Sequence, residues 1–358
     1  MTSKHYVLAI VCGVLGLIGP FIAYNFIVDD FGLFWSSSPK RIWTQEKTSK
    51  YLMSFRYIPK NFDGLLIGPS YSDGLMNTRA IEGFQVYNLS MDGGNATELR
   101  MAAVNALQRG HFKLLIICLT PYITKDSGIK GSQINVKEYW GSLFSLLPVE
   151  MLMAKWQRHE APADDLLRDS DHGSASLARP VYAWNDFVRN EIDDPLENEV
   201  RVDPAAYRDL KSITDAAHRR GIRVFAYYFP NSVWRSASAV GSGDWAGYQR
   251  RVQQLLSDPA DVVWDMMGPD YRSLREDAAC YTDGHLSEAG ARLVMADINR
   301  QIANHLRNAH LPPVFPRSTH LACLGTPGAG SGFDRSIRTQ PLMTAGSPGS
   351  GTPGLRLN

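Results

Sequence analysis

The sequence predicts an α/β domain with a mainly parallel sheet, covered by helices on both faces and preceded by one transmembrane helix. Two observations lead to this prediction. Short apolar runs typical of buried strands alternate with segments of helical spacing, which is the order found in parallel sheets. Ahead of them stands an uncharged apolar stretch, residues 6–28, in a chain of 358 residues.

The apolar stretch is long enough to cross a membrane. At about 1.5 Å per residue in a helix, it spans a hydrocarbon core roughly 30 Å thick. A cleaved signal peptide is the alternative, but no Ala-x-Ala-like site closes the segment. We therefore expect residues 1–28 to be an uncleaved anchor and residues 29–59 to be a tether.

Charges near the anchor favour one orientation. Lys4 and His5 precede it and favour a cytoplasmic N-terminus, although four Lys or Arg residues follow between residues 40 and 50. The main domain is therefore expected on the other side of the membrane, outside the cytoplasm.

The predicted main domain, residues 60–310, contains strands and helices in alternation. The strands are short apolar runs, and the helices carry apolar residues every three or four positions. Ligands of such sheets bind at the carboxyl ends of the strands. The expected strands are residues 61–67, 84–90, 113–119, 222–228 and 261–266, and the expected helices are residues 98–108, 207–220 and 288–306.

Two regions depart from this alternation. The pattern weakens between residues 125 and 200, where we expect an insertion. Its apolar patch, residues 143–156, could cover the core or dock against the membrane or a membrane partner, and the core interpretation is favoured. Roughly half of residues 316–358 are Gly, Pro, Ser or Thr, which predicts a disordered tail.

Composition argues against several classes of protein. The 37 basic and 36 acidic residues nearly balance, so the chain has no nucleic-acid footprint. The histidines are scattered without metal-ligand spacing, so we expect neither a metal nor a cofactor. Four cysteines are too few for a disulfide scaffold, although Cys280 and Cys323 could bridge in an oxidising compartment.

Ser70 is the candidate nucleophile. It closes a Gly-x-Ser turn directly after the strand expected at residues 61–67. Such a turn exposes the hydroxyl and aims backbone N–H groups at a developing oxyanion, provided that a neighbouring base takes the proton. The alternative is a serine that caps a helix beginning near Ser72, and Ser72 itself is a second, weaker candidate.

His285 is the candidate base. It lies in Thr-Asp-Gly-His-Leu-Ser, a polar turn immediately before the helix expected at residues 288–306. Asp283, two residues earlier, could accept a hydrogen bond from the imidazole and stabilise the imidazolium. The alternative is a surface histidine beside a helix cap. At opposite ends of one α/β domain, Ser70 and the Asp283–His285 pair support each other as a catalytic set.

Other polar and aromatic residues follow strands at the same end of the predicted sheet. After the second strand, Gly93 could donate its N–H to an oxyanion and Asn95 its side-chain amide; an ordinary turn explains both equally well. Tyr122, Trp234 and Arg235 follow later strands and could line a sugar site by stacking, the alternative being simple packing of loops.

These motifs, in this order, resemble the SGNH (GDSL-like) hydrolase superfamily over residues 60–306. The resemblance implies a flavodoxin-like three-layer fold, with Ser70 at the nucleophile position, Gly93 at the oxyanion glycine, and Asp283 with His285 at the base motif. Two features depart from the family pattern. The Gly-x-Asn-Asp block is absent after the third strand, where the chain continues into Tyr122, and the common Asp-x-x-His spacing is not met.

Both departures are found in one branch, to which the chain is similar. Membrane-anchored proteins of alginate O-acetylation and the D-alanine transfer protein of teichoic acids have an N-terminal anchor and often lack the third block, and the alginate group uses Asp-x-His. They work beside a membrane-bound O-acyltransferase. The resemblance implies a single-pass protein of the bacterial inner (cytoplasmic) membrane, with its main domain in the periplasm or outside the cell.

The sequence thus predicts a membrane-anchored serine acyltransferase or esterase. It would add or remove an acyl group, expected to be acetyl, on an envelope or secreted polysaccharide through an acyl-serine intermediate. The alternative is a catalytically degenerate scaffold or carbohydrate-binding component of a polysaccharide export complex. The absent Gly-x-Asn-Asp block favours the scaffold, and the intact Ser70, Gly93 and His285 set favours the enzyme.

Overall fold

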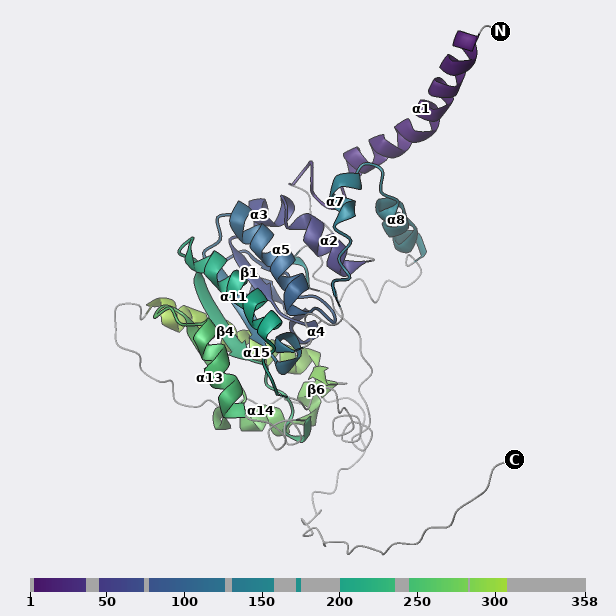
Figure 1. Cartoon of the computed structure of the whole chain (residues 1–358). Coiled ribbons are helices and arrows are strands. Elements are labelled where there is room, and N and C mark those ends of the chain that lie inside the picture. Colours follow the sequence, from purple (N-terminus) through teal and green to yellow (C-terminus); the bar gives the residue numbers. More distant parts are fainter. Residues whose placement is uncertain are drawn as a thin grey trace, which may run out of the picture. The chain divides into compact units, whose positions relative to one another are not determined.

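The computed structural model describes residues 3–36, 45–73, 77–125, 131–157, 172–174, 200–235, 245–282 and 284–307 (Figure 1). Its first element is the helix α1 (Ser3–Val28), which is long and apolar enough to cross a membrane. The length and the apolar character of the predicted anchor helix are therefore confirmed. The predicted tail, residues 316–358, lies outside the described residues.

Five parallel strands form the central sheet. Every neighbouring pair is parallel, and the strand order is β2-β1-β3-β4-β5. The predicted α/β class and parallel sheet are confirmed, with each strand inside or nearly inside its predicted range. The strands are β1 (Gly64–Ile67), β2 (Val86–Asn88), β3 (Leu114–Leu119), β4 (Arg223–Tyr228) and β5 (Val262–Asp265).

Helices cover both faces of the sheet, so the domain has three layers (Figure 1). Alternate strand residues face opposite ways: Leu65 and Ile67 join the core under one set of helices, while Leu66 joins the core on the opposite face. The first set comprises α2 (Glu46–Met53), α3 (Tyr57–Asn61), α5 (Ala96–Arg109), α11 (Pro204–His218) and α13 (Trp245–Leu255), and the opposite face carries α14 (Arg272–Glu276) and α15 (Glu288–Arg307).

Shorter elements connect these layers. They are α4 (Ser70–Asp73), η1 (Thr78–Ala80), α6 (Pro121–Thr124), α7 (Lys137–Gly141), α8 (Leu147–Gln157), η4 (Pro269–Tyr271) and η5 (Ala278–Cys280), with the two-stranded antiparallel pair β6 (Tyr281–Thr282) and β7 (His285–Leu286).

Part of the segment predicted to be a tether is folded. Within residues 29–59, α2 and most of α3 pack on the domain, and Met53, Tyr57 and Ile58 are buried in the same core as Leu65. The prediction was wrong for these helices because both are short, with too few turns to show a clear periodicity. The folded unit therefore includes at least residues 46–61.

The apolar patch at residues 143–156 does not cover the core. Phe144, Leu146 and Trp156 are largely exposed, whereas Leu147 is buried in a small cluster with Phe31 and Leu52. The favoured core interpretation of this patch is therefore wrong for most of its large side chains.

Candidate active site

Ser70 and His285 lie within hydrogen-bond distance of each other. Ser70 Oγ is 2.9 Å from His285 Nε2, although 215 positions separate the two residues in the chain. Both side chains are partly exposed. The hydroxyl is therefore placed where the imidazole can take its proton and where an incoming molecule can reach it.

The turn that carries Ser70 is fixed by close packing. A Cβ atom at Gly68 would lie 2.7 Å from Cys118 Cβ on β3 and would also overlap Ser72 Oγ, so the turn passes too close to β3 for any larger residue. The carbonyl of Pro69 accepts the backbone N–H of Ser72 at 3.1 Å, which closes the first turn of α4. The Gly-x-Ser pattern thus positions Ser70 at the carboxyl end of β1.

Cys118 is the other potential nucleophile beside this turn. It is completely buried, and burial raises the pKa of its thiol to about 12. The thiol therefore stays protonated at neutral pH and does not compete with Ser70.

The turn that carries His285 is fixed by the start of α15. Ser287 donates its hydroxyl to the Ala279 carbonyl and accepts the N–H of Gly290 at 3.2 Å. A Cβ atom at Gly290 would overlap the carbonyl oxygen of Cys280, so the helix closely approaches η5, which ends directly before β6. The Leu-Ser-x-x-Gly pattern is therefore the packing of α15 against the turn that presents His285.

Aromatic stacking also holds the imidazole. The Tyr71 ring stacks on it, with 4.8 Å between ring centroids and 28° between planes, and Tyr71 in turn contacts Phe229. The predicted partner of the imidazole, Asp283, lies outside the described residues.

Arg235 lies against the same turn. A Cβ atom at Gly284, which has a φ of +72°, would overlap the Arg235 guanidinium, and that guanidinium lies 6.0 Å from the centre of the Tyr71 ring. Arg235 is 8 % exposed, so its guanidinium is held inside the protein beside the turn that carries His285. Of the predicted substrate-binding residues, it is the one placed beside His285, while Trp234 is partly buried against the core on the α15 face.

The loop after β2 runs alongside the Ser70 turn. The N–H of Met91 donates to the carbonyl of Gly68 at 3.0 Å, which joins the two loops. Gly93 is exposed and has a φ of +56°, a left-handed conformation that favours glycine. The Tyr122 hydroxyl lies 3.6 Å from where a Gly93 Cβ would be, so Tyr122 approaches the same loop.

Asn95 is occupied as a helix cap. Its side-chain oxygen accepts the N–H of Glu98 at 3.0 Å, and Glu98 accepts the N–H of Asn95 at 3.2 Å, which together form a capping box for α5. The amide nitrogen of Asn95 donates to the Gly131 carbonyl at 2.9 Å. The side chain predicted as an oxyanion donor therefore has a structural role in this arrangement.

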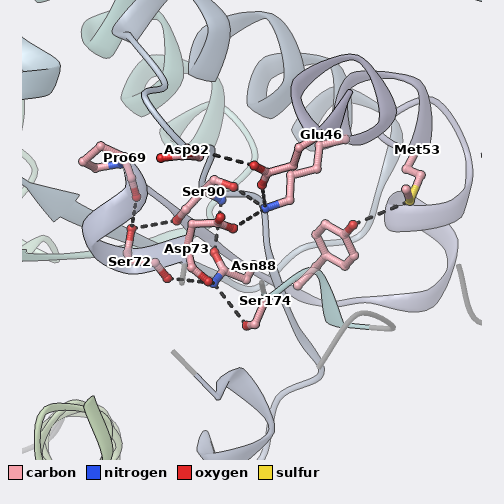
Figure 2. A network of polar contacts seen from close by, with 11 residues as sticks. Glu46, Met53, Pro69, Ser72, Asp73, Asn88, Ser90, Asp92 and Ser174 are labelled. Atoms are coloured by element: carbon pink, nitrogen blue, oxygen red, sulfur yellow. Dashed lines mark hydrogen bonds and ion pairs between the residues drawn. The ribbon is translucent and has the colours of Figure 1, made fainter. Parts of the chain in front are cut away.

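A buried cation, which the sequence interpretation assigned to the tether, lies under both loops. Lys50 of α2 is completely buried, and its ammonium contacts Asp73 and Glu46, each at 2.6 Å, as well as the carbonyl of Ser90 (Figure 2). Glu46 and Lys50 are spaced i,i+4, a signal visible in the sequence, but the partner Asp73 comes from a distant segment.

The charges of this cluster perturb one another. Burial alone would lower the pKa of Lys50, but the carboxylates of Asp73 and Glu46 outweigh it and raise that pKa. Burial and the negative charge of Glu46 raise the pKa of Asp73 well above its ordinary value, against the opposing effect of Lys50. Two carboxyl groups therefore share one ammonium, with Lys50 and Asp73 buried and Glu46 partly exposed.

Neutral hydrogen bonds extend this cluster from α4 to the loop after β2. Ser72 Oγ lies 2.8 Å from Ser90 Oγ, and Asn88 donates its amide to the Ser72 carbonyl at 2.8 Å (Figure 2). Ser72 is completely buried, which leaves it no access to a substrate. Residues 72 and 73, which follow the nucleophile candidate, are thus tied to residues 88 and 90, which precede the loop of Gly93.

Helix α2 also forms direct hydrogen bonds with the Gly93 loop. Lys47 donates to the Gly93 carbonyl at 2.9 Å and to Glu98 at 2.8 Å, and Glu46 accepts the N–H of Asp92 at 3.3 Å. Two charged residues of one short helix, Glu46 and Lys47, therefore hold the loop from which an oxyanion donor is expected.

No protein-family model matches the sequence, and no curated protein matches it.

Proposed function

We propose that this protein is a membrane-anchored serine esterase or O-acyltransferase, acting on acetyl groups of an envelope or secreted polysaccharide. The observation that carries the proposal is the 2.9 Å contact between Ser70 Oγ and His285 Nε2. A serine hydroxyl becomes a nucleophile when a base within hydrogen-bond reach removes its proton during the attack.

In the proposed reaction, Ser70 Oγ attacks the carbonyl carbon of the acyl donor while His285 Nε2 accepts the hydroxyl proton. Backbone N–H groups of Ser70 and Gly93 are the proposed donors to the oxyanion. As the ester C–O bond breaks, the leaving oxygen takes the proton from His285. Water or a sugar hydroxyl then attacks the acyl-serine by the same steps, and Asp283 is the proposed group that orients the imidazole.

The strand order and the positions of Ser70 and His285 support the SGNH resemblance. The strand order is that of flavodoxin-like sheets, in which ligands bind where the order reverses, beside the first strand. Ser70 follows that strand and His285 precedes the last helix, as the resemblance implies. The missing Gly-x-Asn-Asp block leaves the oxyanion to backbone groups and to neighbours such as Tyr122.

One observation supports the proposed membrane anchoring. The helix α1 is long and apolar enough to cross a membrane. The bacterial inner membrane, a main domain in the periplasm or outside the cell, and a membrane-bound O-acyltransferase as acyl donor remain part of the proposal.

The alternative is a non-catalytic scaffold for polysaccharide export. A protein that only binds sugar has no need for a base within 2.9 Å of a partly exposed serine hydroxyl, nor for stacking that holds that base. This geometry favours the enzyme.

The test is acylation of the full-length protein in detergent by p-nitrophenyl acetate, followed by intact-mass spectrometry. We expect an acetyl adduct in the wild type and none in Ser70→Ala. Ser212→Ala, which removes an exposed helix serine, is the matched control and should acylate normally. His285→Gln should slow acylation by about 10²–10⁴-fold. An adduct that persists in Ser70→Ala, or a wild type that forms none, would favour the scaffold.

A further inference from the structure

Residues 136–156 expose a row of large apolar side chains, here called the α7–α8 patch. Its exposed members are Val136, Trp140, Phe144, Leu146, Leu152, Met153 and Trp156, with Trp140 at 86 % and Trp156 at 70 % exposure. Apolar side chains gathered in this number on a surface mark a place where something binds.

Residues 136–156 contain four charged residues, Lys137, Glu138, Glu150 and Lys155, but the stretch from residue 139 to residue 149 contains none. The carboxylate of Glu150 accepts a hydrogen bond from Gln45 at 3.2 Å. Leu147 is buried with Phe31 and Leu52, so the start of α8 is attached to the domain while the large side chains on either side of Leu147 face outward. The uncharged stretch between residues 139 and 149 therefore offers mainly hydrophobic contact.

The turn between α7 and α8 is hydrogen-bonded to α1, the helix that can span a membrane. Asn25, in the last two turns of α1, is 4 % exposed and donates its amide to the carbonyls of Leu143 at 2.9 Å and Ser145 at 3.1 Å. These carbonyls belong to the turn between α7 and α8. Because unpaired carbonyls are costly near hydrocarbon, this bonding makes the turn compatible with the edge of a bilayer.

An aromatic residue that follows α1 packs against the same end of this helix, next to Asn25. Trp35 is half exposed, donates its indole N–H to the Phe26 carbonyl at 3.0 Å, and packs edge-on against the Phe26 ring. Tryptophan is enriched where a protein leaves the bilayer, since its ring is apolar and its N–H is polar. Trp140 and Trp156 give the α7–α8 patch the same character.

We propose that the α7–α8 patch inserts into the lipid surface beside α1 and is a second membrane contact. This inference rests on the proposed anchoring by α1. An apolar segment rich in aromatic residues lies in the interface with its apolar side chains in the acyl region. Because Leu147 and Leu52 share a cluster, and Leu52 belongs to α2, the contact would hold the catalytic domain at a fixed height over the bilayer.

The test uses full-length protein in vesicles of phosphatidylcholine and phosphatidylglycerol, with or without acyl chains brominated near the glycerol. Bromine quenches tryptophan within the bilayer. Trp140→Phe/Trp156→Phe removes the emission of the patch and keeps its apolar surface, and Trp264→Phe is the control, because Trp264 stacks on Phe225 in the sheet. We expect the brominated lipid to remove the emission carried by Trp140 and Trp156 and to leave that carried by Trp264.

Flotation of the vesicles separates this inference from the anchoring on which it rests. Protein that floats and resists carbonate extraction is anchored, whatever happens to the tryptophans. Anchored protein whose Trp140 and Trp156 emission is not quenched would overturn the lipid contact and indicate a protein partner or exposure to water. Protein that does not float would overturn both. A charged variant, Phe144→Glu, should release Trp156 from quenching while flotation continues.

Discussion

Lys50→Met removes the one ammonium that Asp73 and Glu46 share under the Ser70 turn. Asp73 is 1 % exposed and would lose its cation without gaining water, whereas the side chain of Glu46 is 21 % exposed and can rehydrate. Removing one partner of a buried ion pair costs about 3–5 kcal/mol. At roughly 2–4 °C per kcal/mol for a domain of this size, the melting temperature should fall by roughly 6–20 °C.

Circular dichroism of the full-length protein in detergent measures this change. The matched control is Lys113→Met, because Lys113 pairs with Asp63 at 3.0 Å on the surface, with its side chain 68 % exposed. Such a pair contributes about 0–1 kcal/mol, so the control should melt within about 4 °C of the wild type. If Lys50→Met melts no lower than Lys113→Met, the buried ion pair is not what stabilises this region.

A second variant separates charge from packing. Lys50→Met/Asp73→Asn removes the stranded carboxylate together with the ammonium, and apolar or neutral replacements of a buried pair are often tolerated. We expect the double variant to recover part of the melting temperature lost by Lys50→Met. A double variant that melts still lower, by the sum of the two single losses, would mean that packing rather than charge pairing holds the cluster.

Three further predictions concern the same site. Burial and Glu46 raise the folded-state pKa of Asp73, so the stabilising contribution of this group is largest below its unfolded pKa and is lost as the pH rises. The melting temperature of the wild type minus that of Asp73→Asn should therefore decrease from about pH 4 to about pH 8. A difference that stays constant or increases would contradict this. Gly68→Ala should destabilise the fold by about 1–3 kcal/mol, because the added methyl overlaps β3, and it should abolish acylation. Gly141→Ala is the control: the space around Gly141 is open, so neither the melting temperature nor the acylation should change. Asn95→Ala should cost about 0.5–2 kcal/mol as a lost cap and leave the acylation rate unchanged, whereas a rate loss of about 10²–10³-fold would restore Asn95 as an oxyanion donor.

The sheet could be predicted from the sequence because each strand is recognisable from its own local run of apolar residues. The runs that became β1, β3 and β4 are apolar on both faces, as strands buried between two layers of helices must be. Part of the candidate site could also be predicted from local sequence, because the turns of Ser70 and His285 carry glycines that the packing requires. Their approach to 2.9 Å could be inferred only from their order along the chain.

What the sequence could not give are features that depend on distant partners. Lys50 is buried because Asp73 and the Ser90 carbonyl surround it, and no periodicity of α2 reveals that. The exposure of the α7–α8 patch was missed because an apolar run looks the same whether it faces a core or a lipid. Asn95, by contrast, could have been read correctly, since Asn-x-x-Glu before a helix is a capping-box pattern.

Helix α2 connects the residues next to the proposed anchor with the candidate active site. Through Leu52 it packs on Phe31 and Leu147, and through Lys47 and Lys50 it holds the loop of Gly93 and the end of α4. A soluble chain of residues 30–358 should therefore still form the acetyl adduct of Ser70. A chain of residues 62–358 keeps the whole sheet but leaves Asp73 without its ammonium, and it should lose the adduct. If intact-mass spectrometry finds equal acylation of both chains, the contacts of α2 are not needed for acylation, and α2 does not couple the anchor to the candidate site.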